Sequence, residues 1–258
     1  MQSVTRIPGR DTPLKAWARA LALTAPIARN PAVTLPIQIS ELADAFGDKI
    51  ALIGEDETVS YRVLAERSNR FTRWALERGL VPGDVVCLVM HNCPDYLAAW
   101  LGITRTGAVA ALVNTNLVGD SLAHAIRVTA PKCMVVGADL ADAVAAVIPS
   151  LERAVPCWVQ GAAAHGMACI DPALERQPAM TVTASECALP STRDLALYIY
   201  TSGTTGLPKA AKVSHRRLLQ WSYWFAGLLD ADENDRMYDC LPMYHSVGGV
   251  VAIGSMLV

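Results

Sequence analysis

Short apolar runs and longer amphipathic stretches alternate along most of the chain. Each wholly apolar run of strand length is followed by a stretch with helical period. The predicted pairs are Val85–Met90 with Asp95–Thr106, Ala108–Val113 with Asp120–Thr129, and Cys133–Val136 with Leu140–Val147. Buried strands separated by helices predict an α/β fold with a doubly wound, mostly parallel sheet flanked by helices.

The segments on either side of this alternation give weaker signals. Upstream, the pattern predicts a helix over Ser40–Phe46, ended by Gly47, and a strand pair at Ile50–Ile53 and Thr58–Tyr61. A longer helix should run from Arg62 to Gly79. Its buried face would carry Leu64, Phe71 and Ala75, and its solvent face Arg67, Arg70 and Arg73.

Downstream, Ala162–Ala188 reads as an irregular connection, and His215–Leu229 as a helix whose Trp221, Tyr223, Trp224 and Phe225 belong to the core.

The N-terminal 35 residues are predicted to form an arm that precedes the main domain. Asp11–Arg29 has helical period, and Leu14, Trp17, Leu21 and Ala25 share one face. A surface helix docked on the domain is the favoured interpretation. An interfacial membrane helix is the alternative.

Composition narrows the classes of function. A net charge of −2 gives no electrostatic support for nucleic-acid binding. No apolar run reaches the roughly 18 residues that a membrane-spanning helix needs, and residues 1–10 lack a signal-peptide core. The seven cysteines are scattered without metal-type pairing, which favours reduced thiols. We therefore expect a cytoplasmic protein, with peripheral membrane contact left open.

The most informative segment is Tyr198–Lys209, where a β-rich run meets three hydroxyls, two glycines, a proline and a lysine. Backbone amides freed by glycine, together with hydroxyls and a cation, suit a triphosphate. The spacing differs from the common nucleotide loop, because Leu207 and Pro208 separate the second glycine from Lys209. The residues directly after Lys209 have the pattern of a strand, so the segment predicts a strand–loop–strand cradle.

This loop resembles the signature of the adenylate-forming enzymes, which activate carboxylic acids as acyl-AMP. Two further blocks, Leu112–Leu117 and Tyr238–Ser246, resemble the fatty acid transport protein and very-long-chain acyl-CoA synthetase branch. The resemblance implies that residues 36–258 belong to the large AMP-binding domain. The family's later elements, including the mobile C-terminal domain, do not occur in this sequence. The nearly all-apolar end at Val247–Val258 also suggests the front half of a longer synthetase.

Activating an acid requires positioning and electrostatics more than a general base, because the carboxylate is already ionised at neutral pH. The resemblance implies a fatty acid substrate, ATP, Mg²⁺, and coenzyme A as co-substrate. It assigns phosphate binding to the loop residues Thr201, Ser202, Gly203, Thr204, Thr205, Gly206 and Lys209. Thr201 would also help to hold the metal, and Lys209 would offset phosphate charge. His245 resembles the residue that lines the acyl site near the reacting carboxylate.

Several neighbouring residues admit simpler interpretations. Lys212 and His215 are expected to be surface or helix-capping residues. Gly248 and Gly249 fit close approach to a ligand or plain backbone packing equally well. Asn114 and Asn116 are expected to fix a tight loop at a strand's carboxyl end, where such sheets bind ligands. His91, His124 and His165 match no motif.

Three other functions compete with a fatty acyl-CoA synthetase. One is an adenylate-forming enzyme for an aryl or amino acid, and another is a non-catalytic nucleotide- or lipid-binding remnant. A phosphotransferase is the third, and the Leu207-Pro208 insertion argues against it. The sequence alone does not give acyl chain length or oligomeric state.

Overall fold

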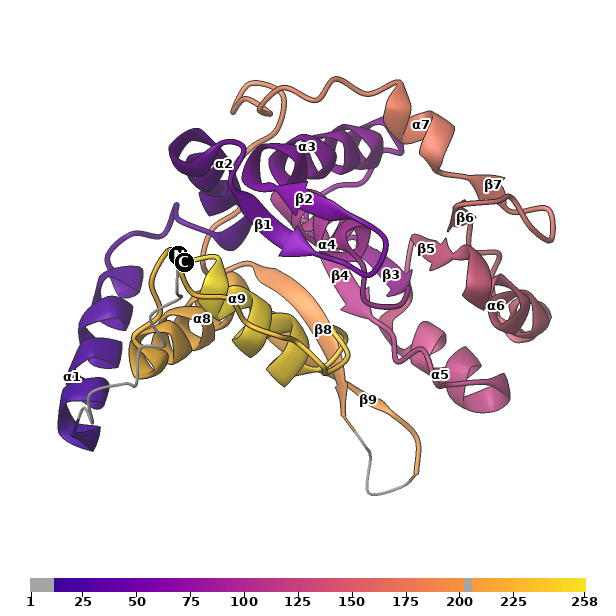
Figure 1. Ribbon diagram of the computed structural model, residues 1–258. Coiled ribbons are helices and arrows are strands. Elements are labelled where there is room, and N and C mark those ends of the chain that lie inside the picture. The colour runs from indigo at the N-terminus through magenta and orange to yellow at the C-terminus, as the bar shows by residue number, and fades with distance from the viewer. Residues whose placement is uncertain (1–11, 202–205) are drawn as a thin grey trace.

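A central sheet of seven strands organises the structure, a computed structural model that describes residues 12–201 and 206–258 (Figure 1). Its strand order is β7-β6-β5-β3-β4-β8-β9. These strands are β3 (Val85–Val89), β4 (Val109–Leu112), β5 (Cys133–Gly137), β6 (Cys157–Gln160), β7 (Ala168–Cys169), β8 (Leu195–Thr201) and β9 (Lys209–Ser214). All neighbours pair in parallel except β8 and β9, which are antiparallel. The predicted fold class is confirmed.

Helices cover both faces of the sheet (Figure 1), and β1 (Ile50–Ile53) and β2 (Thr58–Ser60) form a separate two-stranded hairpin. The α-helices are α1 (Pro13–Thr24), α2 (Leu35–Phe46), α3 (Tyr61–Glu77), α4 (Pro94–Arg105), α5 (Gly119–Thr129), α6 (Ala141–Val147), α7 (Asp171–Glu175), α8 (His215–Leu229) and α9 (Ile253–Met256). The 3-10 segments are η1 (Ala25–Ala28), η2 (Ala138–Leu140) and η3 (Ile148–Ser150), and η4 (Ser246–Ala252) is a π-helix.

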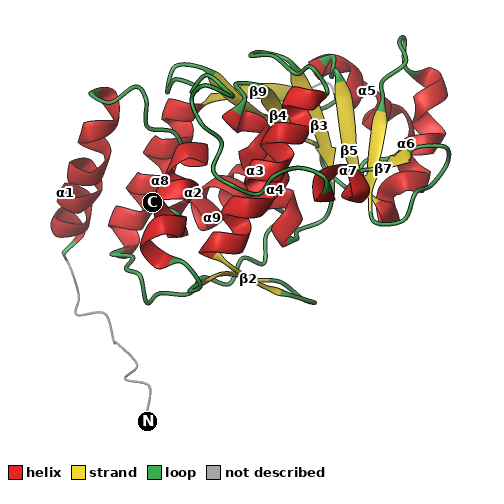
Figure 2. Ribbon diagram, turned by 90° about the horizontal axis from the view of Figure 1, so that it is seen from above, coloured by secondary structure: helices red, strands yellow, loops and turns green. Residues whose placement is uncertain are grey.

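Two cores lie on opposite faces of the sheet because side chains alternate along each strand. In β3, Val86 and Leu88 belong to the core that contains α2, α3, α4 and α8, whereas Cys87 and Val89 belong to the core under α5 and α6. Figure 2 shows these helical layers from above. Since all five residues of β3 are buried, the strand reads as a continuous apolar run.

The segment predicted to be irregular contains more structure than its sequence pattern suggests. Residues 162–188 include β7 and α7, and β6 comes just before them. These are short edge elements of two to five residues, too short for a periodic signal. Helix α2 likewise begins at Leu35 instead of Ser40, with Pro36 in its first turn.

The arginines of α3 were expected to face solvent, and that expectation is wrong for two of them. Arg67 forms ion pairs with Glu57 at 2.6 Å and Asp95 at 2.8 Å. The Arg73 side chain is only 10% exposed and forms an ion pair with Glu186 at 2.9 Å. It also donates hydrogen bonds to the carbonyls of Pro178 and Met180. Helical periodicity predicts on which face of the helix a residue lies. It does not predict which other segment of the protein packs over that face.

Across the two described ranges, no helix is both long enough and apolar enough to cross a membrane. The seven cysteines are free thiols, as expected, and Cys87, Cys133 and Cys187 are buried. Burial raises the pKa of Cys87 and of Cys133 to about 12, so both thiols stay protonated at neutral pH.

Candidate functional site

The strands that flank the predicted phosphate loop form an antiparallel stem. Thr201 ends β8, Lys209 begins β9, and the two residues are register partners. The Thr201 hydroxyl donates a hydrogen bond to the Lys209 carbonyl at 3.5 Å. Ser202, Gly203, Thr204 and Thr205 lie outside the described residues. The structure therefore brings Thr201 and Lys209 together, as the strand–loop–strand prediction requires.

Gly206 closes the described part of the loop with a φ of +84°, in the region that favours glycine. Within the described part of the chain, no heavy atom lies within 4 Å of the position that a Cβ would occupy there. The requirement for glycine is therefore conformational rather than a matter of close packing.

Helix α5 holds the stem from one face of the sheet. The Tyr200 hydroxyl donates to the Ala125 carbonyl at 2.7 Å, and His124 Nε2 lies 3.1 Å from the Pro208 carbonyl. Tyr200 is buried, and burial raises the pKa of its phenol, so the hydroxyl remains a donor. His124 matched no motif, and its contact with the loop became visible only in the fold.

The Asn114–Asn116 turn lies beside the stem. Leu112 of β4 pairs in parallel with Ile199 of β8, so Asn114 and Thr201 both lie two residues further toward the carboxyl ends of neighbouring strands. Asn114 Oδ1 accepts from the Asn116 amide at 2.9 Å, which makes the predicted tight turn. Asn116 Nδ2 then donates to the Tyr244 hydroxyl at 3.0 Å. This contact joins the Tyr238–Ser246 block to the sheet edge.

Asn92, just after β3, fixes the same block through its backbone. Its Nδ2 donates to the Leu241 carbonyl, and its Oδ1 accepts from the Met243 amide, both at 2.8 Å. One amide side chain thus satisfies a donor and an acceptor of a non-helical segment. Sequence reasoning missed this role, because the residue looked like part of an ordinary Asn-Cys-Pro turn.

Tyr244 and His245 lie at the start of the π-helical segment η4. Tyr244 is buried, His245 is exposed, and their ring centroids are 4.6 Å apart. The His245 carbonyl accepts from the Gly249 amide at 2.8 Å. No hydrogen bond joins His245 to Lys209 among the residues that the structure describes.

The glycines of η4 serve backbone packing. A Cβ on Gly249 would lie 2.0 Å from the Met243 carbonyl oxygen, and one on Gly248 would lie 2.6 Å from that of Pro242. Both distances are far below a van der Waals contact. Of the two interpretations left open by the sequence, the structure supports the packing role.

Two other sequence expectations need correction. His215 is fully buried instead of lying at the surface, and among the described residues neither ring nitrogen has a hydrogen-bond partner. Trp221 and Tyr223 are half-buried and pack against the core, as expected, whereas Trp224 and Phe225 are half-buried and line an open hollow. Lys212 is exposed, as expected. His91 and His165 contact Asp139 and Asp142 at the surface.

Comparison with known proteins identifies the class. The profile of the AMP-binding enzyme family, described as "AMP-binding enzyme", matches residues 39–258. The chain therefore belongs to this family, which confirms the predicted adenylate-forming superfamily.

Among curated relatives, the chain is similar to long-chain fatty acid transport protein 6 of Mus musculus, with 37% identity over 210 residues. That match covers 80% of this chain and 33% of the relative. It is also similar to the medium/long-chain-fatty-acid–CoA ligase FadD6 of Mycobacterium tuberculosis, with 32% identity, 92% of this chain and 38% of the relative covered. The chain thus spans about a third of the length of these relatives.

Among solved structures, the fold is similar to that of the anthranilate CoA ligase AuaEII in complex with anthranoyl-AMP. The TM-score is 0.80 at 20% identity, with 88% of this chain and 45% of that chain covered. At this identity the likeness establishes the fold alone.

Proposed function

We propose that this chain forms the nucleotide- and acid-binding part of a fatty acyl-CoA synthetase. A fatty acid and ATP would yield acyl-AMP and pyrophosphate, and coenzyme A would then displace AMP to give the thioester. The observation that carries the proposal is the Thr201–Lys209 stem beside the turn that holds Tyr244. Family membership and the fatty-acid names of two relatives support it.

The chemistry needs little more than two anions held in line. A carboxylate oxygen attacks the α-phosphorus of ATP, a P–O bond forms, and the bond to the pyrophosphate oxygen breaks. Lys209, exposed at the start of β9, would offset charge on the phosphate oxygens. The amides and hydroxyls of residues 201–206 would hold the β- and γ-phosphates. His245 would donate a hydrogen bond near the carboxylate.

Magnesium fits this chain only in part. The described residues contain no group of three or more His, Cys, Asp or Glu side chains that could hold a metal. At the stem, Thr201 offers a single hydroxyl oxygen, whereas Mg²⁺ prefers six oxygens in an octahedron. Mg²⁺ would therefore enter with the phosphates of ATP, and Thr201 would supply at most one of its oxygen ligands.

Residues 36–258 would be an incomplete portion of the large domain, with the thioester step dependent on a mobile domain outside this sequence. The proposal includes peripheral contact with a membrane, because a fatty acid partitions into lipid.

ATP binding tests the stem directly and without turnover. Lys209→Ala should weaken binding of ATP to the purified chain by roughly tenfold or more, because it removes one charge-assisted contact to phosphate. Lys212→Ala is the matched control: the same strand, residue type and exposure, but three positions further on and hence on the other face. Calorimetry with equal loss for both variants, or with no ATP binding by the unmodified chain, would contradict the proposal.

Acid specificity is tested by pyrophosphate exchange in a protein that carries the chain together with its mobile domain. Exchange that depends on long-chain fatty acids is expected. Exchange that depends on aryl or amino acids would favour the first rival function, and ATP binding without exchange would favour a non-catalytic remnant. ATP-dependent acyl-CoA synthesis by the 258-residue chain alone would refute the dependence on a mobile domain.

A further inference from the structure

Helix α1 docks on α8 through small residues. Ala20 is fully buried, and a Cβ on Gly227 would lie only 2.6 Å from the Ala20 Cα, so the two backbones are nearly in contact. The Arg19 Nε donates to the Gly227 carbonyl at 2.6 Å and pairs with Asp230 at 3.1 Å. The helix is therefore held by its alanine face, not by its largest apolar side chains.

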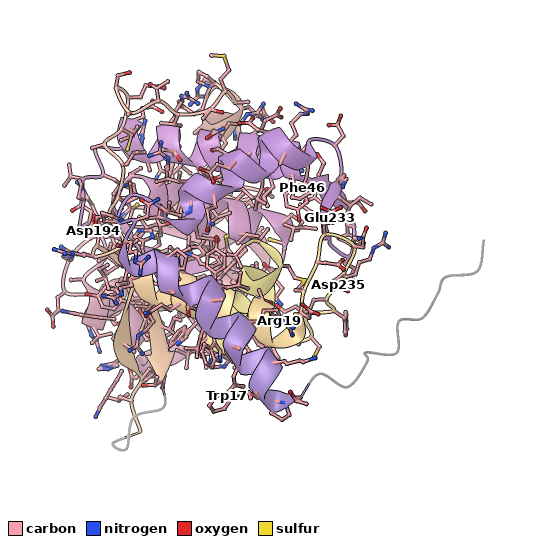
Figure 3. All side chains as sticks on the ribbon, turned by 90° about the vertical axis from the view of Figure 1, so that its left-hand side faces the viewer. Trp17, Arg19, Phe46, Asp194, Glu233 and Asp235 are labelled. Carbon is pink, nitrogen blue, oxygen red and sulfur yellow. The ribbon has the colours of Figure 1, made fainter. Side chains whose placement is uncertain are left out.

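Those larger side chains point outward. Leu14 is 79% exposed, Trp17 59% and Leu21 57%, and their spacing places them on one stripe of the helix. Figure 3 shows α1 across the front of the molecule, with Trp17 near its lower end. If α1 were docked through this stripe, the three side chains would be buried. They are exposed instead.

Aromatic residues of α8 extend the stripe. The Trp17 and Trp224 ring centroids are 6.3 Å apart in an edge arrangement. An open hollow of about 480 Å³ lies beside them, lined by Thr24, Gln220, Trp221, Trp224 and Phe225. We name Leu14, Trp17, Leu21, Trp221 and Trp224 the α1–α8 face. In Figure 1 both helices lie at the left edge of the molecule, and α1 is outermost.

The charges of these two helices have one sign. They carry Lys15, Arg19, Arg216 and Arg217 and no acidic residue, although the chain as a whole is negative. The Arg217 guanidinium stacks 5.3 Å from the Trp221 ring centroid. Carboxylates lie at the ends of this helix pair: Asp230 pairs with Arg19, the Asp194 carbonyl accepts from the His215 amide at the start of α8, and in Figure 3 Asp194 lies on one side of α1 and Glu233 and Asp235 on the other. Tryptophan, leucine and cations together suit the boundary between lipid headgroups and acyl chains.

We propose that the α1–α8 face binds the surface of an anionic lipid bilayer. Leu14, Trp17 and Leu21 enter the headgroup region, while Lys15, Arg216 and Arg217 stay among the lipid phosphates. A second copy of the chain is a poorer occupant, because two identical faces would bring these cations together. The inference deepens the membrane contact within the proposed function, but it uses no residue of the ATP stem.

Vesicle flotation tests this surface with the whole chain. The protein should float with vesicles of phosphatidylcholine and phosphatidylglycerol more than with phosphatidylcholine alone, and added salt should narrow the difference. Leu14→Ser/Leu21→Ser should lower partitioning about tenfold, because two exposed apolar side chains are lost. Met180→Ser, which removes an apolar side chain that is 75% exposed outside this face, should change nothing. Arg216→Gln/Arg217→Gln should abolish the preference for the anionic vesicles.

The outcomes separate this inference from the proposed function. Flotation by a chain that fails to bind ATP would uphold the surface and reject the stem. Absence of flotation, or equal flotation of the chain and its Leu14→Ser/Leu21→Ser variant, would overturn the lipid proposal whatever the ATP result. So would a dimer in analytical ultracentrifugation that the same double variant converts to monomer, because the face would then be a protein interface.

Discussion

Single amide side chains position the candidate acid site. Asn92 and Asn116 attach the Tyr238–Ser246 block to the ends of β3 and β4, through backbone groups in one case and the Tyr244 hydroxyl in the other. Among the described residues, neither side chain forms a hydrogen bond with the phosphate stem, yet both determine where Tyr244 and His245 lie. Their polar groups satisfy an irregular segment that has no ladder or helix of its own.

His215 allows a prediction at the residue scale. Its complete burial lowers the pKa of the imidazole to about 4, despite the opposing effect of the nearby Asp194 carboxylate. The folded protein therefore keeps this histidine neutral, while the unfolded chain protonates it near pH 6.5. The free energy of unfolding should fall as the pH drops from 6.5 toward 4, by up to about 3 kcal/mol from this group.

Denaturant titrations across that pH range measure the effect as a difference between proteins. His215→Phe should flatten the slope, since no buried imidazole remains to titrate. His91→Gln, at an exposed histidine paired with Asp139, should keep the slope of the unmodified chain. Identical slopes for the chain and His215→Phe would mean that the imidazole is protonated within the fold.

At the same scale, the sequence predicted residue types better than residue contacts. Thr201 and Lys209 were predicted because a chemical motif carries them, and their pairing results from strands that flank a loop. Asn92 and His124 were not, because their partners, Met243 and Pro208, are 151 and 84 positions away. A pattern of local periodicity contains no information on such distant partners.

At the scale of elements, the long periodic segments were predictable and the short edge elements were not. Strands β3, β4 and β5 and the helices after them lie within a few residues of their expected bounds. Each is a run of apolar residues whose period is set by burial. For α1, the period identified the shared face of Leu14, Trp17 and Leu21, and the helix docks on the domain as expected, but the sequence did not indicate that this face stays exposed. Helix α1 packs on α8 through Ala20 and Gly227 instead, because these small residues allow the two backbones to come closer.

The segment over α3 gives a prediction at this scale. Arg73 donates to the carbonyls of Pro178 at 2.8 Å and Met180 at 2.6 Å and pairs with Glu186, whose pKa is lowered to about 2 by the Thr183 amide and by Arg73. Arg73→Ala should lower the free energy of unfolding by about 2 kcal/mol, because these carbonyls lose their partner.

Hydrogen exchange should locate the change in residues 178–186 and leave β3 protected. Arg62→Ala removes an exposed arginine of the same helix and its surface pair with Asp48, so it should not alter exchange there. Unchanged exchange in Arg73→Ala would show that the segment is held by its apolar contacts instead.

At the scale of the whole molecule, one sheet is shared by two cores, and the candidate site lies at its edge. The phosphate stem belongs to β8 and β9, while the turn that holds Tyr244 comes after β4, so the site depends on the register of neighbouring strands. The local sequence motif predicts the phosphate loop. The residues that lie beside the loop are determined by the order and register of the strands. Because the strands contribute side chains to both cores, the two helical layers are coupled through the strands that they share.

That coupling predicts a single cooperative unfolding transition. Trp74 and Trp100 lie in the core with α3 and α4, whereas Val144 of α6 lies in the core on the other face. Val144→Ala should lower the free energy of unfolding by about 2 kcal/mol. Because the strands belong to both cores, tryptophan fluorescence and far-ultraviolet circular dichroism should shift together. Val128→Ala, on the exposed side of α5, should shift neither signal. A fluorescence transition that stayed in place while the dichroism moved would mean that the α5–α6 layer unfolds on its own.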